Sequence, residues 1–441
     1  MQEAVQNVIN AFKVKDVRNK ILFTLVMLFV IRIGCNIPVP GVSTDFFKNL
    51  LDRLQAQDAV GWLSSMTGGS LEQMSILALS ITPYITSSII MELLTIAIPP
   101  LEEIAKEGSD GRRKIAEYTR YVTVVLALLE SSAMAIGFGG QGFLKEYNVM
   151  SVIVAIFTMT AGSAFLMWIG ERITENGVGN GISIVLMFNI ISSLPQDLSM
   201  LFERFMKGKT VAFQVTYALI IMGVLVAIVA YSIVLESARR EIPVQYASRI
   251  AGRRSIAGGN STIPLKVNTA GVIPVIFASS LMSLPVIIAQ FLDVYNTPIG
   301  NVLAFLNSST WFNKNYPIYS VGALLYIFLV IFFAYFYTSI TFNPTEVASN
   351  IKKQGGFIPG LRQGSETAEF LTKILNYIIF IGAVGLCIVA FIPVMISSIF
   401  NISRISFLGT SLLIVVGVVI ETVNAIKSQL VVRNYDGFLS A

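Results

Sequence analysis

Side chains that could carry out acid–base, nucleophilic or metal chemistry are few and widely spaced in this sequence. It contains no histidine and two cysteines, Cys35 and Cys387, each within an apolar stretch. We therefore expect no soft-metal site, no histidine proton relay and no disulfide framework. No phosphate-binding loop or nucleophile–base set is recognisable, so we expect neither enzyme activity nor a cofactor.

Three glutamates, Glu92, Glu130 and Glu421, lie within apolar stretches. A carboxylate that faces lipid is costly, so we expect these side chains to face protein or an aqueous path across a membrane. Glu421 lies near the end of its stretch, and placement at the membrane interface is an equally good interpretation of it.

The elements that must position these residues are membrane spans. Of the 441 residues, 54% are hydrophobic and 13% are charged, and the mean hydropathy is +0.72. This composition predicts an all-α polytopic membrane protein. Residues 1–20 form an amphipathic basic segment without a long apolar core, so we expect a cytoplasmic surface segment rather than a cleavable signal.

Apolar runs of about 17–25 residues predict ten spans, at 21–37, 75–98, 118–137, 151–170, 181–198, 212–235, 268–291, 317–339, 374–396 and 407–427. The fifth is the weakest, because its firmly apolar part is short enough for a re-entrant segment. Lys and Arg concentrate in the alternate connecting segments that include both termini, which predicts cytoplasmic termini. Ten spans divide into two five-helix halves, and we hypothesise that these run with inverted topology.

The stretch from residue 61 to residue 99 is unusual for the start of a span. A half-polar segment, GWLSSMTGGSLEQM (61–74), precedes the apolar run SILALSITPYITSSIIMELLTIAIP (75–99). Such an arrangement is typical of a segment folded back into a cavity, followed by the helix that lines it. We therefore interpret the two parts as the stopper and one wall of a gated pore.

Two predicted cytoplasmic loops are larger than a helix hairpin needs. The loop 236–267 carries a set of basic residues, Arg239, Arg240, Arg249, Arg253, Arg254 and Lys266. The loop 340–373 places Arg362 between Gly360 and Gly364. Positive-inside bias and contact with anionic headgroups account for part of this charge, and we assign Lys352 and Lys353 to that role. For the loop tips we favour docking to an RNA or protein surface.

Six strings carry a resemblance that covers almost the whole chain in order. They are IPVPG (37–41), ITPYITSSII (81–90), ERITENGVGNGIS (171–183), PLKVNTAGVIPVIFASS (264–280), FNPTEVASNIKKQGGFIPGLRQG (342–364) and GTSLLIVVGVVIET (409–422). Together they resemble the SecY family, the channel subunits of the bacterial protein translocon. The resemblance implies a central hourglass pore between the two inverted five-helix halves.

In this family a ring of aliphatic side chains narrows the pore. The matching positions are Ile81, Ile85, Ile89, Leu186, Ile276 and Ile414. Each residue alone would suggest ordinary helix packing, and only the resemblance indicates a ring. An aliphatic constriction gives ions nothing to replace their hydration shell and so resists leakage. The resemblance also implies a plug at about residues 58–72, including Gly61, Trp62, Leu63, Met66, Gly68 and Gly69.

The resemblance further implies a lateral gate between spans 2 and 3 on one side and spans 7 and 8 on the other. Its polar cluster would be Thr86, Glu130 and Asn268. The basic tips would dock the ribosome or the SecA motor through Arg249, Arg253, Arg254 and Arg362. Other implied partners are the SecE and SecG subunits, signal sequences, nascent polypeptides and the lipid bilayer.

The expected function is a protein-conducting channel of the bacterial plasma membrane for secretion and for lateral insertion of membrane proteins. The rivals are a secondary transporter of small solutes, which predicts a polar site at the midplane, and an insertase without a pore, which needs no plug. The predicted division of the chain is 1–20 as the amphipathic N-terminal segment, 21–198 as the first half, 199–235 as an external loop with span 6, 236–267 and 340–373 as basic loops, 268–339 and 374–427 as paired spans, and 428–441 as a tail.

Overall fold

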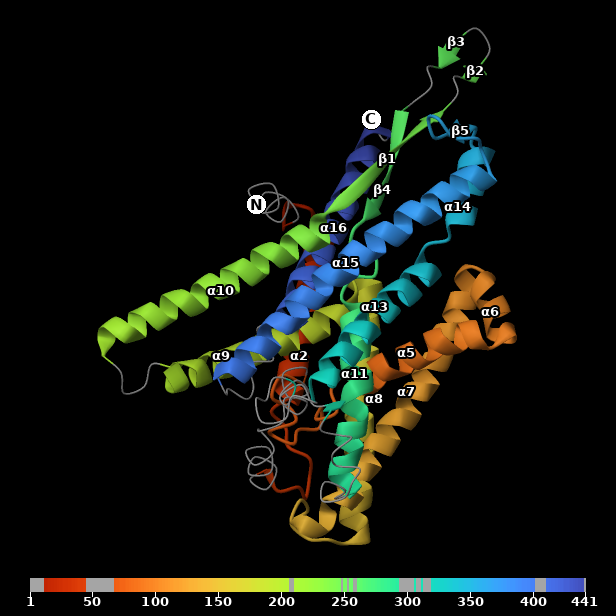
Figure 1. Cartoon of the computed structure of the whole chain (residues 1–441). Helices are drawn as coiled ribbons and strands as arrows, with labels where there is room; N and C mark the ends of the chain where they lie inside the picture. The colour runs from red at the N-terminus through yellow and green to blue at the C-terminus, as the bar shows by residue number, and fades with distance from the viewer. Residues whose placement is uncertain are drawn as a thin grey trace.

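The computed structural model of the chain is mostly helical (Figure 1). It describes residues 12–44, 67–205, 210–246, 249–251, 254–256, 260–292, 305–306, 311, 319–400 and 410–439. The helices are α2 (Lys15–Gly34), α5 (Thr82–Ala97), α6 (Pro99–Lys106), α7 (Ser109–Gly137), the short η1 (Gly139–Gln141), α8 (Val149–Asn176), α9 (Gly181–Phe205), α10 (Val211–Ser237), α11 (Ile273–Leu292), α13 (Ser320–Thr341), α14 (Pro344–Lys353), α15 (Ser365–Phe400) and α16 (Thr410–Leu439). Each of the ten predicted spans overlaps one long helix of this set.

Six helices in the described part of the chain are long and apolar enough to cross a membrane. The number rises to seven if α5 and α6, which meet at a bend of 102°, count as one broken span. Two further apolar helices are shorter, Gly181–Pro195 within α9 and Ile273–Met282 within α11. The structure therefore has six or more candidate spans, and ten remains a prediction.

The helix ends differ from the predicted span ends where charge or tertiary contact decides them. Helix α7 begins at Ser109 rather than 118, and α15 begins at Ser365 rather than 374. Both extensions are rich in charged residues, which a helix accepts once it leaves the apolar layer. By contrast, α5 begins only at Thr82, because residues 75–81, predicted as part of span 2, form turns.

Both predicted basic loops contain regular structure. Strand β1 (Arg239–Tyr246) pairs antiparallel with β4 (Asn260–Lys266) and with β5 (Gly356–Phe357), in the order β4-β1-β5. The short strands β2 (Arg249–Ala251) and β3 (Arg254–Ile256) pair at the tip. Figure 1 shows this tip projecting beyond the helices at one end of the molecule.

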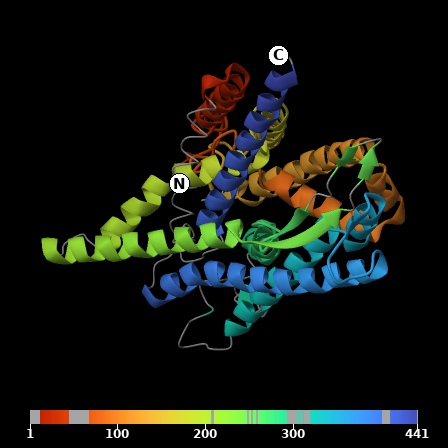
Figure 2. The same cartoon turned by 90° about the horizontal axis from the view of Figure 1, so that it is seen from above.

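The sheet, α14 and the beginning of α15 share an apolar core, and we call this unit the β-module. Alternate residues of β1, Ile242 and Val244, are buried with Leu265 of β4. They pack against Ile351 of α14 and Leu371 of α15. The two basic segments are thus one folded body, attached directly to a long helix. Seen from above, α10 and α15 run side by side (Figure 2).

Among the described residues, three large apolar clusters join the helices, besides the core of the β-module and two smaller clusters. One joins α10, α11, α13, α15 and α16. A second joins α7, α8 and the turn segment before α5. The third, which we call the central cluster, takes residues from α2, α8 and α9 on one side and from α11 and α16 on the other. The central cluster therefore links the part of the chain before α10 with the part after it.

Candidate pore and gate

The central cluster contains most of the residues predicted to form the aliphatic ring. Ile81, Leu186, Ile276 and Ile414 are buried in it, and Ile85 packs against it. These residues come from four segments that are far apart in the sequence. Ile89 instead packs against the cluster of α10, α11, α13, α15 and α16. The structure therefore brings five of the six predicted ring residues together.

Each buried ring residue lies close to the beginning of its helix. Ile81 is the residue just before α5, and Ile276 lies in the first turn of α11. Leu186 and Ile414 lie within the first two turns of α9 and α16. A residue at the beginning of a helix takes its position from the segment before the helix as well as from the helix itself. The turn segments that precede α5 and α11 are thus part of the site.

The segment 68–81 before α5 is largely buried although it forms turns rather than a helix. Backbone of this kind survives inside a membrane protein only where other groups satisfy its N–H and C=O groups. Gly68 and Gly69 have φ of 63° and 81°, the left-handed region that glycine enters at little cost. Met74 and Ser80 also have positive φ, 43° and 54°, which side chains disfavour. Tertiary contacts must therefore hold this segment in place.

Some of the contacts that hold this segment come from residues 37–39, which belong to the IPVPG string of the sequence. The N–H of Val39 donates to the Met74 carbonyl at 2.9 Å, and the N–H of Ile76 donates to the Ile37 carbonyl at 2.8 Å. Within the segment, the Ser70 hydroxyl lies 2.8 Å from the Thr67 carbonyl and 3.0 Å from the Leu77 carbonyl. These contacts give hydrogen-bond partners to backbone groups of the segment.

Polar side chains from three helices complete the support. The Arg32 guanidinium of α2 donates to the Gly68 carbonyl at 3.2 Å. The Asn189 amide of α9 donates to the Ser80 hydroxyl at 3.0 Å, and Ser163 of α8 donates to the Ser80 carbonyl at 3.3 Å. The sequence motifs did not lead us to assign Asn189 or Ser163 to the site. Their signal was available, because a buried polar residue in an apolar run needs a partner.

The described end of the predicted plug lies against α9. A Cβ added to Gly68 would sit 3.0 Å from the Asn189 backbone, one helical turn beyond Leu186. Gly68 therefore lies next to α9, whereas Leu71 packs in the cluster of α7 and α8. The other predicted plug residues, Gly61, Trp62, Leu63 and Met66, lie outside the described residues.

The three residues of the predicted lateral-gate cluster have different surroundings. The Thr86 hydroxyl donates to the Thr82 carbonyl of its own helix at 3.2 Å. Asn268 is buried and donates from Nδ2 to Oε2 of Glu236 at 2.8 Å. Glu130 is half-buried on α7. Among the hydrogen bonds of the described residues, none joins Thr86, Glu130 and Asn268 to one another.

The helices on each side of the predicted gate pack as pairs. Helix α5 packs against α7, and α11 packs against α13. The Ser87 hydroxyl of α5 donates to the Thr119 carbonyl of α7 at 2.7 Å. Glu92, also on α5, is half-buried, and its Oε2 atom has no hydrogen-bond partner within the described chain. Glu421 is exposed near the middle of α16.

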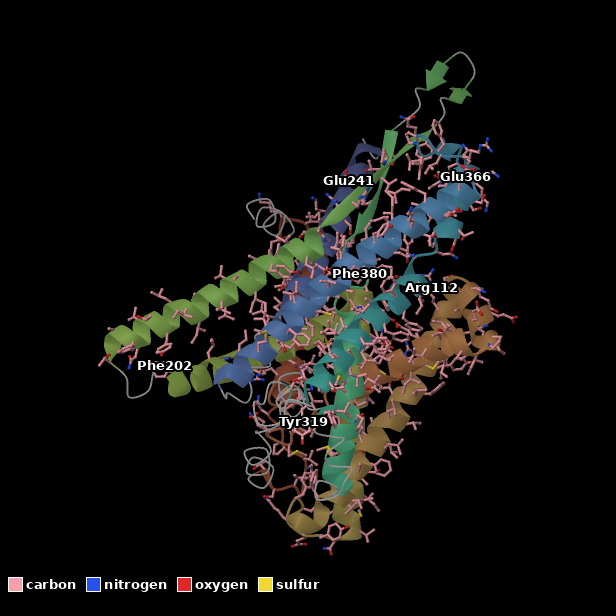
Figure 3. The ribbon with its side chains drawn as sticks, viewed as in Figure 1. Arg112, Phe202, Glu241, Tyr319, Glu366 and Phe380 are labelled. Carbon is pink, nitrogen blue, oxygen red and sulfur yellow. The ribbon has the colours of Figure 1, made fainter. Side chains whose placement is uncertain are left out.

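Three of the four predicted docking residues lie on the β-module or on the β2–β3 tip. Arg362 is exposed in a turn between Gly360 and Gly364, which have φ of 86° and 104°. Its N–H donates to Glu366 at 3.3 Å, and its carbonyl accepts from Thr367 at 2.8 Å. Glu366 and Glu241 of β1 are labelled at this end of the molecule in Figure 3. Arg249 and Arg254 belong to the β2–β3 tip, whereas Arg253 lies outside the described residues.

Comparison with known proteins identifies relatives along nearly the whole chain. The SecY family model matches residues 75–423. A "Protein translocase subunit SecY" of Streptomyces scabiei is 43% identical over 97% of this chain and 98% of its own length. The protein of the same name from Halalkalibacterium halodurans is 41% identical over 98% of both chains.

Solved structures share the fold at lower sequence identity. A chain described as "The structure of a protein conducting channel" is 18% identical and has a TM-score of 0.62, with 94% of this chain and 93% of that chain covered. A chain of "Sec61 in the Canine ribosome-channel complex from the endoplasmic reticulum" has a TM-score of 0.58 at 18% identity, with 94% and 93% covered. The family model and the full-length relatives show that this chain belongs to the SecY family.

Proposed function

We propose that the protein is a gated, protein-conducting channel that moves unfolded polypeptides across the bacterial plasma membrane and releases apolar segments sideways into the bilayer. The observation that carries the proposal is the central cluster, where five aliphatic residues from four separate segments converge. An apolar constriction resists ions and also closes around a passing chain of any sequence. A secondary transporter would need a polar site at this place, so the cluster does not favour that alternative.

The proposed architecture has ten spans in two inverted halves, with both termini in the cytoplasm and residues 58–72 as the plug. The predicted division of the chain follows from this architecture. Two observations support this architecture. Each predicted span overlaps a helix, and the central cluster joins the part of the chain before α10 to the part after it. The lateral gate would open between the α5–α7 pair and the α11–α13 pair, which contact each other through α7 and α11.

The proposed partners act from outside the membrane-embedded part. An energy source is needed because the chain itself is a passive conduit, and we propose that the ribosome or SecA supplies it after docking at Arg249, Arg253, Arg254 and Arg362. The exposed position of Arg362 supports this role, as does the likeness to a Sec61 chain that belongs to a ribosome-channel complex. We also propose SecE and SecG as subunits, and signal sequences as ligands of the lateral gate.

A conductance measurement tests the proposed constriction. Channels with glycine at Ile81, Ile85, Ile276 and Ile414 are reconstituted into planar bilayers, and the resting ion current is compared with that of the unsubstituted protein. We expect a clear increase, because the gaps let water and ions enter the pore. Ile169→Gly is the matched control, since Ile169 is buried in the same cluster but lies on α8. Unchanged current in the ring variant, or an equal increase in the control, would refute the assignment.

A further inference from the structure

The short connection between the β-module and α11 determines where α11 begins. Strand β4 ends at Lys266 and α11 begins at Ile273. The N–H of Val267 donates to the Ala238 carbonyl at 2.8 Å, which closes the base of the hairpin. Gly271 then turns the chain with φ of 62°, and its N–H points to the Asn268 carbonyl at 3.4 Å. The chain thus passes from sheet to helix in one tight bend.

Asn268 fastens this bend to the end of α10. The residue is only 4% exposed, and its Nδ2 lies 2.8 Å from Oε2 of Glu236, in the last turn of α10. A hydrogen bond to a carboxylate is stronger than one between neutral groups. Lys266 and Glu421 are the charged neighbours of Glu236. Glu236 is therefore hydrogen-bonded to the beginning of the bend, and the charge of Lys266 at the end of the hairpin acts on it.

Helix α15 holds the bend from another side. A Cβ added to Gly382 would clash with the Val267 carbonyl oxygen and would lie 3.7 Å from the Asn268 Cα. The backbone of Val267 and Asn268 thus packs directly on α15, at a position where glycine allows close approach. Figure 1 shows α10, α15 and the base of the β1–β4 hairpin meeting in this region.

The bend leads directly to a residue of the central cluster. Val272 packs against two apolar clusters, and its carbonyl accepts from the N–H of Ile276 at 3.2 Å. Ile276 is buried in the central cluster. A displacement of Asn268 must therefore shift the first turn of α11 and, with it, Ile276.

We propose that Glu236 is a positioning residue for the gate: its hydrogen bond to Asn268 couples the β-module to α11, so that a partner docked on the module moves α11. The β-module can move as one rigid body because its strands and helices share an apolar core. This inference rests on the proposed function for the existence of docking and of a gate. The inference adds that Glu236 is the residue through which docking is linked to the gate.

Three variants separate the hydrogen bond from charge and from general effects. Glu236→Ala removes the acceptor, whereas Glu236→Gln keeps an acceptor oxygen and removes the charge. Glu241→Ala is the matched control, because Glu241 is an exposed carboxylate of the same hairpin, 3.7 Å from Arg239. All three are prepared as full-length protein in nanodiscs.

Hydrogen exchange tests whether Glu236 positions the bend. In Glu236→Ala we expect the backbone amides of residues 267–273 to exchange at least about tenfold faster than in the unsubstituted protein. Glu236→Gln and Glu241→Ala should stay within about threefold of it. If exchange in Glu236→Ala is unchanged, or if Glu236→Gln behaves like Glu236→Ala, a hydrogen bond from Glu236 does not hold the bend, and the inference fails.

Disulfide trapping tests the coupling. One cysteine is placed on α7 and one on the side of α11 that faces it, with Cys35 and Cys387 replaced by alanine, and the rate of disulfide formation is measured with and without ribosomes. We expect ribosomes to change the rate at least about threefold in the unsubstituted protein and in Glu236→Gln. In Glu236→Ala the ribosome should bind equally well but leave the rate nearly unchanged.

Failure of this inference differs from failure of the proposed function. If ribosomes change the rate equally in Glu236→Ala and in the unsubstituted protein, docking and gating stand but Glu236 does not couple them. If ribosomes do not bind the unsubstituted protein, or bind without changing its rate, the proposed docking or gating is wrong. The proposed coupling between the β-module and α11 is then wrong as well. The hydrogen-exchange experiment still decides whether Glu236 positions the bend.

Discussion

The segments before α5 and α11 each position one residue of the central cluster, but different contacts hold the two segments in place. Each is non-helical, and each delivers an isoleucine, Ile81 or Ile276, to the central cluster. The segment 67–81 is held by hydrogen bonds from α2, α8 and α9 and from residues 37–39. The segment 267–272 is held by the hydrogen bond between Asn268 and Glu236, by the backbone hydrogen bond from Val267 to Ala238, and by its close contact with Gly382. Val272 at its end packs against two apolar clusters.

This difference indicates which side of the constriction is fixed and which is adjustable. Many independent contacts make the position of a segment insensitive to the loss of any one, whereas a segment with few contacts opens at lower free energy. The segment 67–81 before α5 is therefore the fixed wall of the constriction. The segment 267–272 before α11 is the adjustable one, and a movement of the β-module can displace it.

The largest effect is expected at the glycine that faces the fixed segment. A Cβ at Gly162 of α8 would fall on the carbonyl oxygen of Ile76, a backbone atom that buried neighbours prevent from moving. We expect Gly162→Ala to lower the free energy of unfolding by about 3 kcal/mol. Thermal unfolding in detergent measures this loss. Gly223→Ala is the control, since a Cβ on that α10 glycine would meet nothing within 4 Å.

A smaller effect is expected at the glycine that faces the adjustable segment. A Cβ at Gly382 would fall on the Val267 carbonyl oxygen, but the six-residue bend has fewer contacts and can shift. We expect Gly382→Ala to cost about 1–2 kcal/mol in the same unfolding assay. It should also change the disulfide trapping rate between α7 and α11 without ribosomes. If Gly382→Ala costs more than Gly162→Ala, the assignment of fixed and adjustable sides is reversed.

The smallest effect is expected from a single contact of the fixed wall. Ser80 and Asn189 interact through one hydrogen bond of 3.0 Å. A double-mutant cycle of Ser80→Ala and Asn189→Ala should give a coupling energy of about 1 kcal/mol. Because other contacts remain, the resting ion current of each single variant should stay close to that of the unsubstituted protein. A large leak in either one would show that the wall depends on this contact alone.

The positions of the helices could be predicted from the sequence, since apolar runs mark them. Span 2 is the instructive exception: residues 75–81 are apolar enough for a helix, yet they form turns, and Ser80 has positive φ where Ser163 and Asn189 of distant helices hydrogen-bond to it. No local pattern reports such contacts. The strands of the β-module did have a local signal, the alternation of buried Ile242 and Val244 with exposed neighbours in β1, which the predicted loop 236–267 overlooked.

The candidate site, too, could be predicted from the sequence only in part. Ile81, Leu186, Ile276 and Ile414 were selected by resemblance to a family, because nothing in their types distinguishes them from other buried aliphatic residues. Asn268 was assigned to a cluster with Thr86 and Glu130, but its hydrogen-bond partner in the structure is Glu236. The two residues lie 32 positions apart on either side of the hairpin. Only the closure of that hairpin brings them together, and sequence spacing does not reveal it.

The support of Ser80 also constrains the order in which the chain folds during synthesis. Its carbonyl accepts from Ser163, 83 residues later, and its hydroxyl accepts from Asn189, 109 residues later. Until α8 and α9 have left the ribosome, these polar groups of the turn before α5 lack those partners and disfavour burial in lipid. The first wall of the constriction therefore cannot be completed as it emerges. It has to wait, in water or beside another protein, for the helices that will enclose it.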